Sequence, residues 1–394
     1  MRLCSKAAFY LLASIVVSFL AGSSAPTPLY ALYQARWGFS PIVVTLIFGI
    51  YAVAVLLSLL FAGRLSDHLG RRPVLLAAIG AQTLTMILLA TAGGLVQLLL
   101  ARVLQGLAAG AAVAALGAGM IDLDKTRGAT ANAVAPAFGT ATGGILAGFM
   151  VQYLPAPTHL VYAFLAAVFV LQGVGVILMP ETIAPQPGAL ASLKPQFRLP
   201  RPVREPLLLA LPVLVAAWAL ASFYGALGPT LVRGLSGSGS ALFGGLALFA
   251  LAASAGLGVL VLQHREARAM MSFGAAALAV GVGLTAWTLP QHSLLLFFLG
   301  TVIAGVGFGT GFQGAVRSIV PFAAAHERAG VLSIVFIVSY LALGVPAVAA
   351  GALLARHGDI LGTAREFGTA VMGLALLAVL ATGLRALTRR PAAA

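Results

Sequence analysis

One stretch of ten residues gathers charge in a chain that has little of it. Residues 63–72 read GRLSDHLGRR, with three arginines, one aspartate and one histidine, whereas charged residues make up only 8% of the sequence. Glycine and arginine together can cradle a phosphate group, contact a nucleic acid, or mark the turn between two helices. A phosphate-binding loop follows a strand and ends in Lys-Ser or Lys-Thr. This stretch follows an apolar segment and has neither ending, which argues against phosphate binding.

The groups that carry protons or bind metals all lie outside the apolar segments. The nine acidic residues and the six histidines fall in loops or at segment edges. They are Asp67, Asp122, Asp124, Glu181, Glu205, Glu266, Glu327, Asp359, Glu366, His68, His159, His264, His292, His326 and His357. Membrane enzymes need a paired aspartate, a metal-ligand cluster or a Ser-His pair inside the bilayer. The sequence therefore indicates no enzyme, no metal site and no cofactor.

Long apolar runs dominate the chain. Hydrophobic residues make up 61% of the sequence and the mean hydropathy is +1.05, whereas soluble domains contain about 45–50% apolar residues. Twelve runs are long enough to cross the bilayer, which takes roughly 20 residues each. They lie at 7–29, 41–62, 73–92, 95–120, 130–153, 159–179, 207–231, 240–262, 270–289, 292–315, 330–354 and 367–387. Because backbone groups in lipid must pair within one element, the chain is predicted to be an all-α polytopic membrane protein embedded in the lipid bilayer.

The first run also has features of a secretory signal. It begins with basic residues, continues with an apolar stretch and ends in small residues, which is the pattern of a cleaved leader. Pro26 would directly follow the cleavage site, where cleavage is poorly tolerated, and eleven more runs follow. We therefore expect the first run to remain as a membrane span.

Basic residues predict the orientation, because Lys and Arg in short loops stay on the cytoplasmic side. With both termini in the cytoplasm, eighteen of the 23 Lys and Arg residues lie inside, four lie outside and one, Arg102, lies within a run. The inner ones are Arg2, Lys6, Arg64, Arg71, Arg72, Lys125, Arg127, Lys194, Arg198, Arg201, Arg204, Arg265, Arg268, Arg317, Arg328, Arg385, Arg389 and Arg390, and the outer ones are Arg36, Arg233, Arg356 and Arg365. This explains the net charge of +14 without a nucleic-acid partner and predicts the cytoplasmic (inner) membrane as the location.

A polar segment divides the chain in two. Residues 180–205 are rich in proline, basic and too polar to be buried in lipid. They predict a cytoplasmic linker between an N-terminal six-helix bundle, residues 1–179, and a C-terminal six-helix bundle, residues 206–394. Weak internal similarity supports this division, since KTRGATAN around Arg127 is followed 201 residues later by HERAGVLS around Arg328. A parallel duplication gives such an offset. The single cysteine, Cys4, provides no disulfide framework.

The decapeptide has features of a structured turn. Asp67 and Arg71 are four residues apart, a spacing at which opposite charges pair on one helix face. Gly63 is expected to let the preceding helix end close against a neighbour, and Gly70 to permit a tight reversal of the backbone.

Set between the second and third runs, the decapeptide resembles the loop motif of the major facilitator superfamily. That motif reads Gly, three residues, Asp, a basic residue, any residue, Gly, Arg, and Arg or Lys; His68 departs from it mildly. The resemblance implies twelve transmembrane helices in two pseudo-symmetric six-helix bundles, and a loop that latches the bundles together in the outward-facing state. The implied latch residues are Gly63, Asp67, Gly70, Arg71 and Arg72, joined by Asp122 or Asp124. The alternative for Arg64 and Arg72 is that they only set the orientation.

The fourth run contains an arginine at depth. Arg102, Gln105 and Gly106 share one helix face with Gly110, and a buried guanidinium is costly unless it finds partners, so Arg102 is a candidate for coupling or substrate binding. The pattern resembles the span-four motif of the superfamily, Arg, two residues, Gln, Gly, which is associated with proton transfer in coupled members. The alternative is that Arg102 extends to the lipid headgroups.

The fifth run is rich in glycine. Gly139, Gly143 and Gly144 fall in APAFGTATGGILAG, where such spacing favours close helix packing. The stretch also resembles the span-five motif of the superfamily's antiporters, in which Gly-Pro is followed two residues later by Gly-Gly. Thr140 replaces the proline, and Pro136 lies one turn earlier. The resemblance implies export.

The central cavity is predicted to be apolar and aromatic. Sugar sites need clustered amides and carboxylates, but Asn132 is the sole asparagine, and no run holds the carboxylate that a cationic drug would require. The candidate cavity residues are Tyr51, Trp218, Phe223, Tyr224, Phe312, Gln313 and Tyr340, together with Arg102. Each is also compatible with core packing. The substrate is predicted to be a small, uncharged amphipathic or weakly acidic molecule.

The sequence predicts a monomeric secondary transporter that works by alternating access. Proton-coupled efflux is the first hypothesis, with the small molecule and protons as partners. The alternative is facilitated or proton-coupled uptake of a small metabolite, because proton carriers are usually buried carboxylates or imidazoles. Coupling would have to use an edge carboxylate such as Asp122. A receptor would bring a soluble domain, for which the loops are too short.

Overall fold

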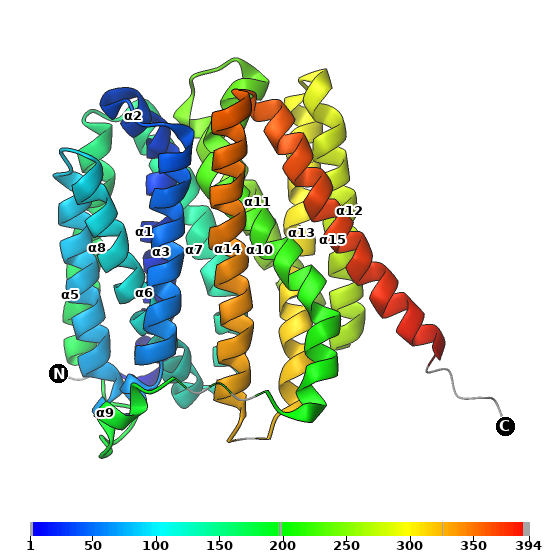
Figure 1. Ribbon diagram of the computed structural model, residues 1–394. Coiled ribbons are helices and arrows are strands. Elements are labelled where there is room, and N and C mark those ends of the chain that lie inside the picture. Colours follow the sequence, from blue (N-terminus) through cyan, green and yellow to red (C-terminus); the bar gives the residue numbers. More distant parts are fainter. Residues whose placement is uncertain (1–2, 196, 198, 325, 389–394) are drawn as a thin grey trace.

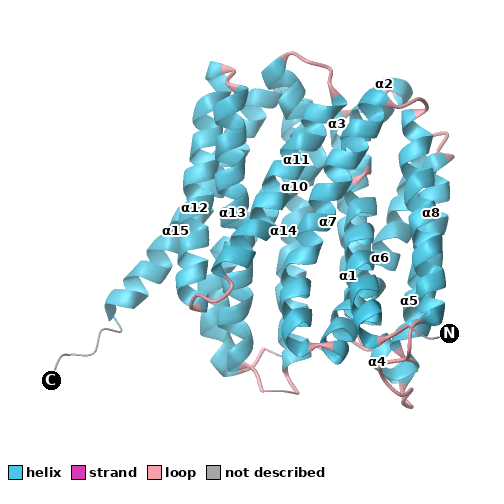
Figure 2. Ribbon diagram, turned by 180° about the vertical axis from the view of Figure 1, so that it is seen from behind, coloured by secondary structure: helices cyan, strands magenta, loops and turns pink. Residues whose placement is uncertain are grey.

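The computed structural model describes residues 3–195, 197, 199–324 and 326–388. All regular structure in this part is helical, and the long helices run side by side (Figures 1 and 2). Of the basic residues that support the predicted orientation, Arg2, Arg198, Arg389 and Arg390 lie outside the described residues.

The first half of the chain forms the N-terminal bundle and the segment that follows it. Its helices are α1 (Ser5–Ser24), α2 (Pro26–Trp37), α3 (Pro41–Ala62), α4 (Leu65–Leu69), α5 (Arg71–Ala90), α6 (Leu95–Leu123), α7 (Lys125–Tyr153), α8 (Pro157–Leu178) and α9 (Ala189–Ser192). The short helices α4 and α9 lie at the end of the molecule that also holds the N terminus, at the bottom of Figure 1. We call this end the lower face and the opposite end, where α2 lies, the upper face.

The second half forms the C-terminal bundle. Its elements are α10 (Arg201–Ser236), α11 (Ala241–Leu262), α12 (Ala267–Thr288), the 3-10 turn η1 (Leu289–Gln291), α13 (Leu294–Ile319), the 3-10 turn η2 (Val320–Phe322), α14 (Arg328–His357) and α15 (Ile360–Thr388).

Twelve segments among the described residues are long and apolar enough to span a membrane, with α1 and α2 together forming the first. The predicted all-α architecture of twelve spans is confirmed. Some boundaries differ: the first span continues through α2 to Trp37, the seventh begins at Arg201 and the twelfth at Ile360. The last five residues of the predicted linker are therefore helical, and the domain ranges 1–179 and 206–394 stay predictions.

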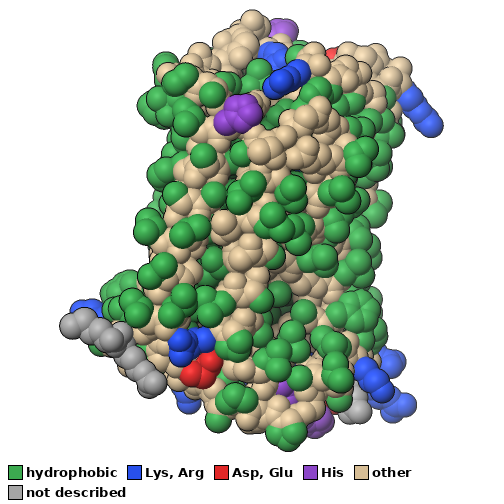
Figure 3. Space-filling model, turned by 90° about the vertical axis from the view of Figure 1, so that its left-hand side faces the viewer, with side chains coloured by type: hydrophobic (Ala, Val, Ile, Leu, Met, Phe, Trp, Pro, Cys, Tyr) green, Lys and Arg blue, Asp and Glu red, His purple; other side chains and the backbone are tan. Residues whose placement is uncertain are grey.

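The surface matches a bilayer environment. On the face seen in Figure 3, charged side chains gather at the two ends, and the band between them is apolar or uncharged. Large side chains such as Leu100, Leu171 and Val261 are more than 60% exposed in this protein, which is costly in water and favourable in lipid. The orientation of the two faces stays a prediction, with the lower face in the cytoplasm.

The two bundles meet along two helix pairs, α3 with α14 and α7 with α11, and α2 adds contacts to α10. At the upper end the approach is close, since a Cβ on Gly351 would fall on the side chain of Thr45. Gln152 also accepts a hydrogen bond from the backbone N–H of Ala241 at 3.1 Å. These contacts close the upper face between the bundles.

The glycines of α7 let this helix pack against both halves. A Cβ on Gly139 would lie 2.6 Å from the carbonyl of Val17, and one on Gly143 only 2.2 Å from that of Ala21, both in α1. On the other side, Gly144 lies against Gly245 of α11. These close approaches support the predicted packing role of the glycines, because any side chain would force the helices apart.

We predict that Gly143→Ala lowers stability by about 1–3 kcal/mol, because the added methyl group overpacks a contact made by backbone atoms. Thermal unfolding of the detergent-purified protein measures this. Gly80→Ala is the matched control, since it also lies within a helix and its Cβ would meet nothing within 4 Å. Equal unfolding temperatures for the two variants would contradict the packing role.

Candidate functional site

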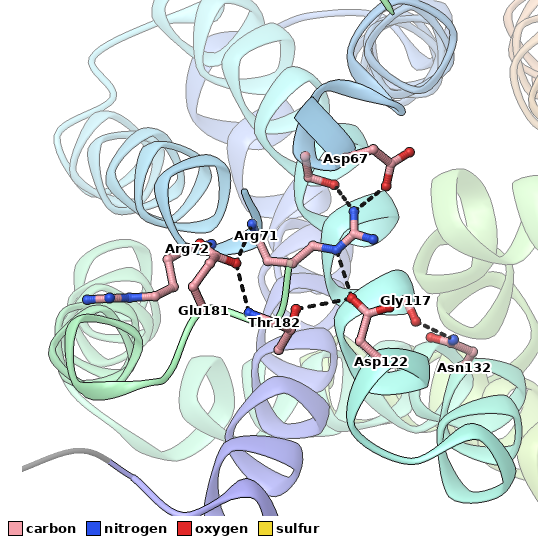
Figure 4. Close-up of polar contacts among 9 residues, drawn as sticks. Asp67, Arg71, Arg72, Gly117, Asp122, Asn132, Glu181 and Thr182 are labelled. Carbon is pink, nitrogen blue, oxygen red and sulfur yellow. Dashed lines mark hydrogen bonds and ion pairs between the residues drawn. The ribbon is translucent and has the colours of Figure 1, made fainter. Parts of the chain in front are cut away.

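Arg71 is the centre of an ionic network on the lower face (Figure 4). Its Nη1 donates to Asp67 Oδ1 at 2.5 Å and to Ser66 Oγ at 2.7 Å, and its Nε donates to Asp122 Oδ2 at 3.1 Å. The side chain of Arg71 is only 5% exposed. The expected pairing of Asp67 with Arg71 is present, and a nearly buried cation is neutralised by two carboxylates.

The structure distinguishes the two aspartates at the end of α6. Asp122 joins Arg71, whereas Asp124 accepts a hydrogen bond from the backbone N–H of Arg127 at 2.9 Å. Asp124 therefore serves as the N-cap of α7. Its ion pair with the Arg127 side chain is long, at 3.7 Å, and exposed, so it contributes little.

Glu181, which directly follows the sixth span, caps the helix that begins at Arg71. Its carboxylate accepts hydrogen bonds from the backbone N–H groups of Arg71 at 2.8 Å and Arg72 at 3.0 Å, where the helix dipole favours negative charge. Gly70 makes this possible, because its φ is +96° and a Cβ would lie 2.7 Å from the Glu181 carboxylate. The predicted reversal at Gly70 is confirmed, and the role of Glu181 was not predicted from the sequence.

The start of the linker is fastened to the same loop. Thr182 Oγ1 donates to Asp122 Oδ2 at 3.1 Å. The backbone N–H of Gln186 donates to the carbonyl of His68 at 2.8 Å, and the imidazole Nδ1 of His68 lies 3.0 Å from the carbonyl oxygen of Pro187. His68, which departs from the family motif, thus contacts the linker.

Two further residues of the decapeptide bear on the expectations. The three atoms nearest to a Cβ on Gly63 all belong to Leu59 of α3, so the close approach of Gly63 to a neighbouring helix stays a prediction. Arg72 does more than set orientation: its guanidinium donates to the carbonyls of Val176, at 3.2 Å, and Ile177. These carbonyls lie in the last turn of α8, where helices lack internal donors.

All the described partners of Arg71 belong to the first half of the chain or to the linker. Asp67 keeps 47% of its side chain exposed. The arrangement therefore fastens the loop, the end of α6 and the linker to one another, and its carboxylates stay partly exposed on the lower face.

Arg102 lies at the centre of the N-terminal bundle. It is fully buried, and its Nη1 donates to the carbonyl of Ser23 at 3.1 Å and to the side-chain oxygen of Gln105. Gln105 Nε2 in turn donates to the carbonyl of Gly22 at 3.0 Å. The Tyr51 ring covers the guanidinium at 4.2 Å, a cation–π distance. The alternative that Arg102 extends to the headgroups is wrong.

A break in the first span explains these contacts. Pro26 has no backbone N–H, so the carbonyl of Gly22, four residues earlier, loses its helical partner. Within lipid such a group must be satisfied by a neighbour, and Gln105 supplies the donor. Arg102 lies beside it at the C-terminal end of α1, where the helix dipole favours a cation.

The second half repeats this proline, although α10 continues through it as one helix. Gly22 and Pro26 stand in GSSAPT, and Gly225 and Pro229 stand in GALGPT, 203 residues later. Pro229 frees the carbonyl of Gly225, which accepts a hydrogen bond from Thr27 Oγ1 at 2.9 Å. The donor belongs to the other bundle. This repeat of Gly, three residues, Pro-Thr is the sequence signal that could have located the contact.

Gly106 brings Tyr51 over Arg102. A Cβ on Gly106 would lie 2.6 Å from both the Ala54 Cβ and the Tyr51 carbonyl oxygen, so α6 and α3 touch through their backbones. One turn away, this approach places the Tyr51 ring on the Arg102 guanidinium.

The structure brings together some of the candidate cavity residues. The Trp218 ring lies 5.4 Å from Phe312 and 5.5 Å from Tyr340, and Phe308 joins them at 6.0 Å. These four side chains come from α10, α13 and α14 of the C-terminal bundle, and α14 packs against α3 of the other bundle.

Other candidates lie apart from this cluster. Phe223 packs on Phe367 at 4.9 Å, and Tyr224 shares a hydrogen bond of 2.7 Å with Thr301. Both side chains are about 3% exposed within the C-terminal bundle, which is core packing. Gln313 is partly buried beside Phe312 on α13.

A pocket of about 230 Å³ lies between the bundles at the upper face. It is lined by Gln34, Pro41, Val44, Leu227, Thr230, Leu354, Gly358 and Ile360. The lining comes from α2 and α3 on one side and from α10, α14 and α15 on the other. The volume of the pocket therefore depends on the relative position of the two bundles.

We predict that Thr27→Val weakens the closure of the upper face, because the buried carbonyl of Gly225 loses its donor, at a cost of about 1–3 kcal/mol. The measurement is the labelling rate of Val44→Cys, a pocket residue, by a membrane-impermeant thiol reagent in a background of Cys4→Ser. We expect several-fold faster labelling. Thr142→Val is the control, since Thr142 bonds only within its own helix. An unchanged rate in Thr27→Val would contradict the role of this bond.

Comparisons with known proteins agree with the fold. The structure resembles that of the nucleoside transporter NupG, with a TM-score of 0.72, 11% identity, and coverage of 98% of this chain and 100% of that one. It also resembles the human organic anion transporter MFSD10 (TETRAN), with a TM-score of 0.68, 17% identity, and coverage of 97% and 100%. No curated protein matches the sequence. Residues 11–345 match the family described as the Major Facilitator Superfamily, and the chain belongs to this family of membrane transporters.

Proposed function

We propose that the protein exports a small amphipathic or weakly acidic organic molecule across the cytoplasmic membrane by alternating access, coupled to protons. The observation that carries the substrate class is the aromatic cluster of Trp218, Phe312 and Tyr340, whose helix α14 lies at the interface with the other bundle. Such a surface binds apolar bodies and offers few hydrogen bonds to a sugar.

The coupling group is proposed to lie at the edge of the membrane. None of the nine acidic residues or six histidines is buried, and all fifteen lie in the described part. Asp122 is the best placed carboxylate, because it connects the end of α6 with Arg71 and Thr182. A change in its protonation would alter the network on the lower face.

The direction of transport is proposed from α7. Gly143 and Gly144 match the span-five pattern of the antiporters in the family, and they pack on α1 and α11, one in each bundle. A specific observation favours facilitated uptake as the second candidate: proton carriers are usually buried, and this chain buries none.

We predict that proteoliposomes transport weak acids with apolar bodies, and that an imposed pH gradient accelerates export. The measurement is flux of a panel containing aromatic and aliphatic acids, a neutral sugar and a quaternary amine, in both directions and with or without the gradient. Flux that is equal with and without the gradient would favour the facilitator. Transport of the sugar or the amine without the acids would reject the substrate class.

We predict that Asp67→Asn and Asp122→Asn each reduce flux by tenfold or more, because the Arg71 cation loses one of the two carboxylates that hold it. Asp124→Asn is the matched control: it lies two residues from Asp122, and asparagine is an equally good N-cap. Surface expression is measured alongside. Normal flux in either of the first two variants would reject a role for the network in transport.

A further inference from the structure

Only one of the three guanidinium nitrogens of Arg102 donates hydrogen bonds to the protein. Nη1 has two acceptors, but Nε and Nη2 have none, although the side chain is fully buried. In a guanidinium these two atoms form one edge, with parallel N–H bonds that match the two oxygens of a carboxylate. Buried donors of this kind are normally satisfied.

We propose that the Nε–Nη2 edge of Arg102 is the binding subsite for the carboxylate of a monoanionic substrate. This inference rests on the proposed function and narrows it, since it selects an organic acid from the broader substrate class. Binding in this way would use the free edge and leave the contacts of Nη1 with the first span in place.

Charge balance supports a single negative charge. Every acidic residue of the chain is partly or fully exposed, so no carboxylate of the protein is buried with Arg102. The carbonyls at the end of α1 offset only part of the charge. A buried cation without a counter-ion is strongly unfavourable. One carboxylate would neutralise it, whereas a phosphate dianion would leave a buried negative charge.

The hydroxyl of Tyr30 would complete the subsite. The hydroxyl of Tyr30 is buried and has no hydrogen-bond partner, and it lies close enough to Arg102 to interact with its charge. It can donate to a carboxylate bound at the free edge. Tyr51 covers the guanidinium face, which leaves the edge of the group to the ligand.

The apolar part of the ligand would lie toward the other bundle. Tyr51 covers Arg102 from α3, and α3 packs against α14, which carries Tyr340 of the aromatic cluster around Trp218. The indole N–H of Trp218 is also buried without a partner. The acid group would thus lie in the N-terminal bundle with the apolar body directed toward the cluster, so that the bound acid would connect the two bundles.

The test is calorimetric binding to the full chain in lipid nanodiscs, with 3-phenylpropionate, hexanoate and 3-phenylpropionamide as probes. The acids should bind at least tenfold more tightly than the amide, which has the same body without the charge. Arg102→Lys keeps a cation and a donor for Ser23 but loses the planar edge. It should weaken acid binding by tenfold or more and leave amide binding unchanged.

Tyr30→Phe keeps the test decisive if Arg102→Lys does not fold. It removes a hydroxyl that makes no bond in the protein, so stability should not fall, while acid binding should weaken several-fold. Equal binding of acid and amide, no binding of either acid, unchanged acid binding in both variants, or tighter binding of phenyl phosphate than of the acids would overturn the subsite.

Transport is measured separately, so that failure of the proposed function can be distinguished from failure of the proposed subsite. Acid binding that depends on Arg102, without flux of any acid in proteoliposomes, would reject the transport of acids and retain the subsite. Flux of neutral amphipathic compounds together with equal binding of acid and amide would retain the transporter and overturn the subsite.

Discussion

A backbone carbonyl inside a membrane must find a donor, and two prolines in this protein remove the donors of two carbonyls. Pro26 frees the carbonyl of Gly22 and Pro229 frees that of Gly225, because proline lacks the N–H that a helix would supply four residues later. The first carbonyl is satisfied by Gln105 within its bundle, the second by Thr27 across the bundle interface. The same physical requirement thus holds one bundle together in the first half and joins the two bundles in the second.

Close backbone contact between helices is the second constraint, and the first depends on it. Donors can reach the freed carbonyls only where helices approach closely, and glycines permit that approach. Gly106 lets α6 touch α3, which puts Tyr51 on Arg102, and Gly143 lets α7 touch α1 just before the proline break. In lipid, helix association gains nothing from removing apolar surface from water, so such close packing and buried polar contacts carry the specificity.

The two arginines Arg71, on the lower face, and Arg102, inside the N-terminal bundle, are neutralised to different extents. On the lower face, Arg71 is held by two carboxylates, and Glu181 supplies a further negative charge at the start of α5. The carboxylates of this network are partly exposed, so a change in protonation can alter it. Arg102 lies where no carboxylate reaches it, and the protein satisfies only one of its nitrogens. An adjustable ionic network and an incompletely satisfied buried cation are suited to different tasks, the first to conformational change and the second to an anionic ligand.

The sequence by itself determined the twelve spans, the helical class, the family and the pairing of Asp67 with Arg71, because these depend on run length, composition and spacing along one helix. It did not choose between Asp122 and Asp124, or show that Glu181 caps the helix beginning at Arg71. Only the tertiary structure decided those points, since they depend on which helix ends lie side by side. It also separated the aromatic cluster from core residues such as Tyr224, because an apolar side chain has the same character in a cavity and in a core.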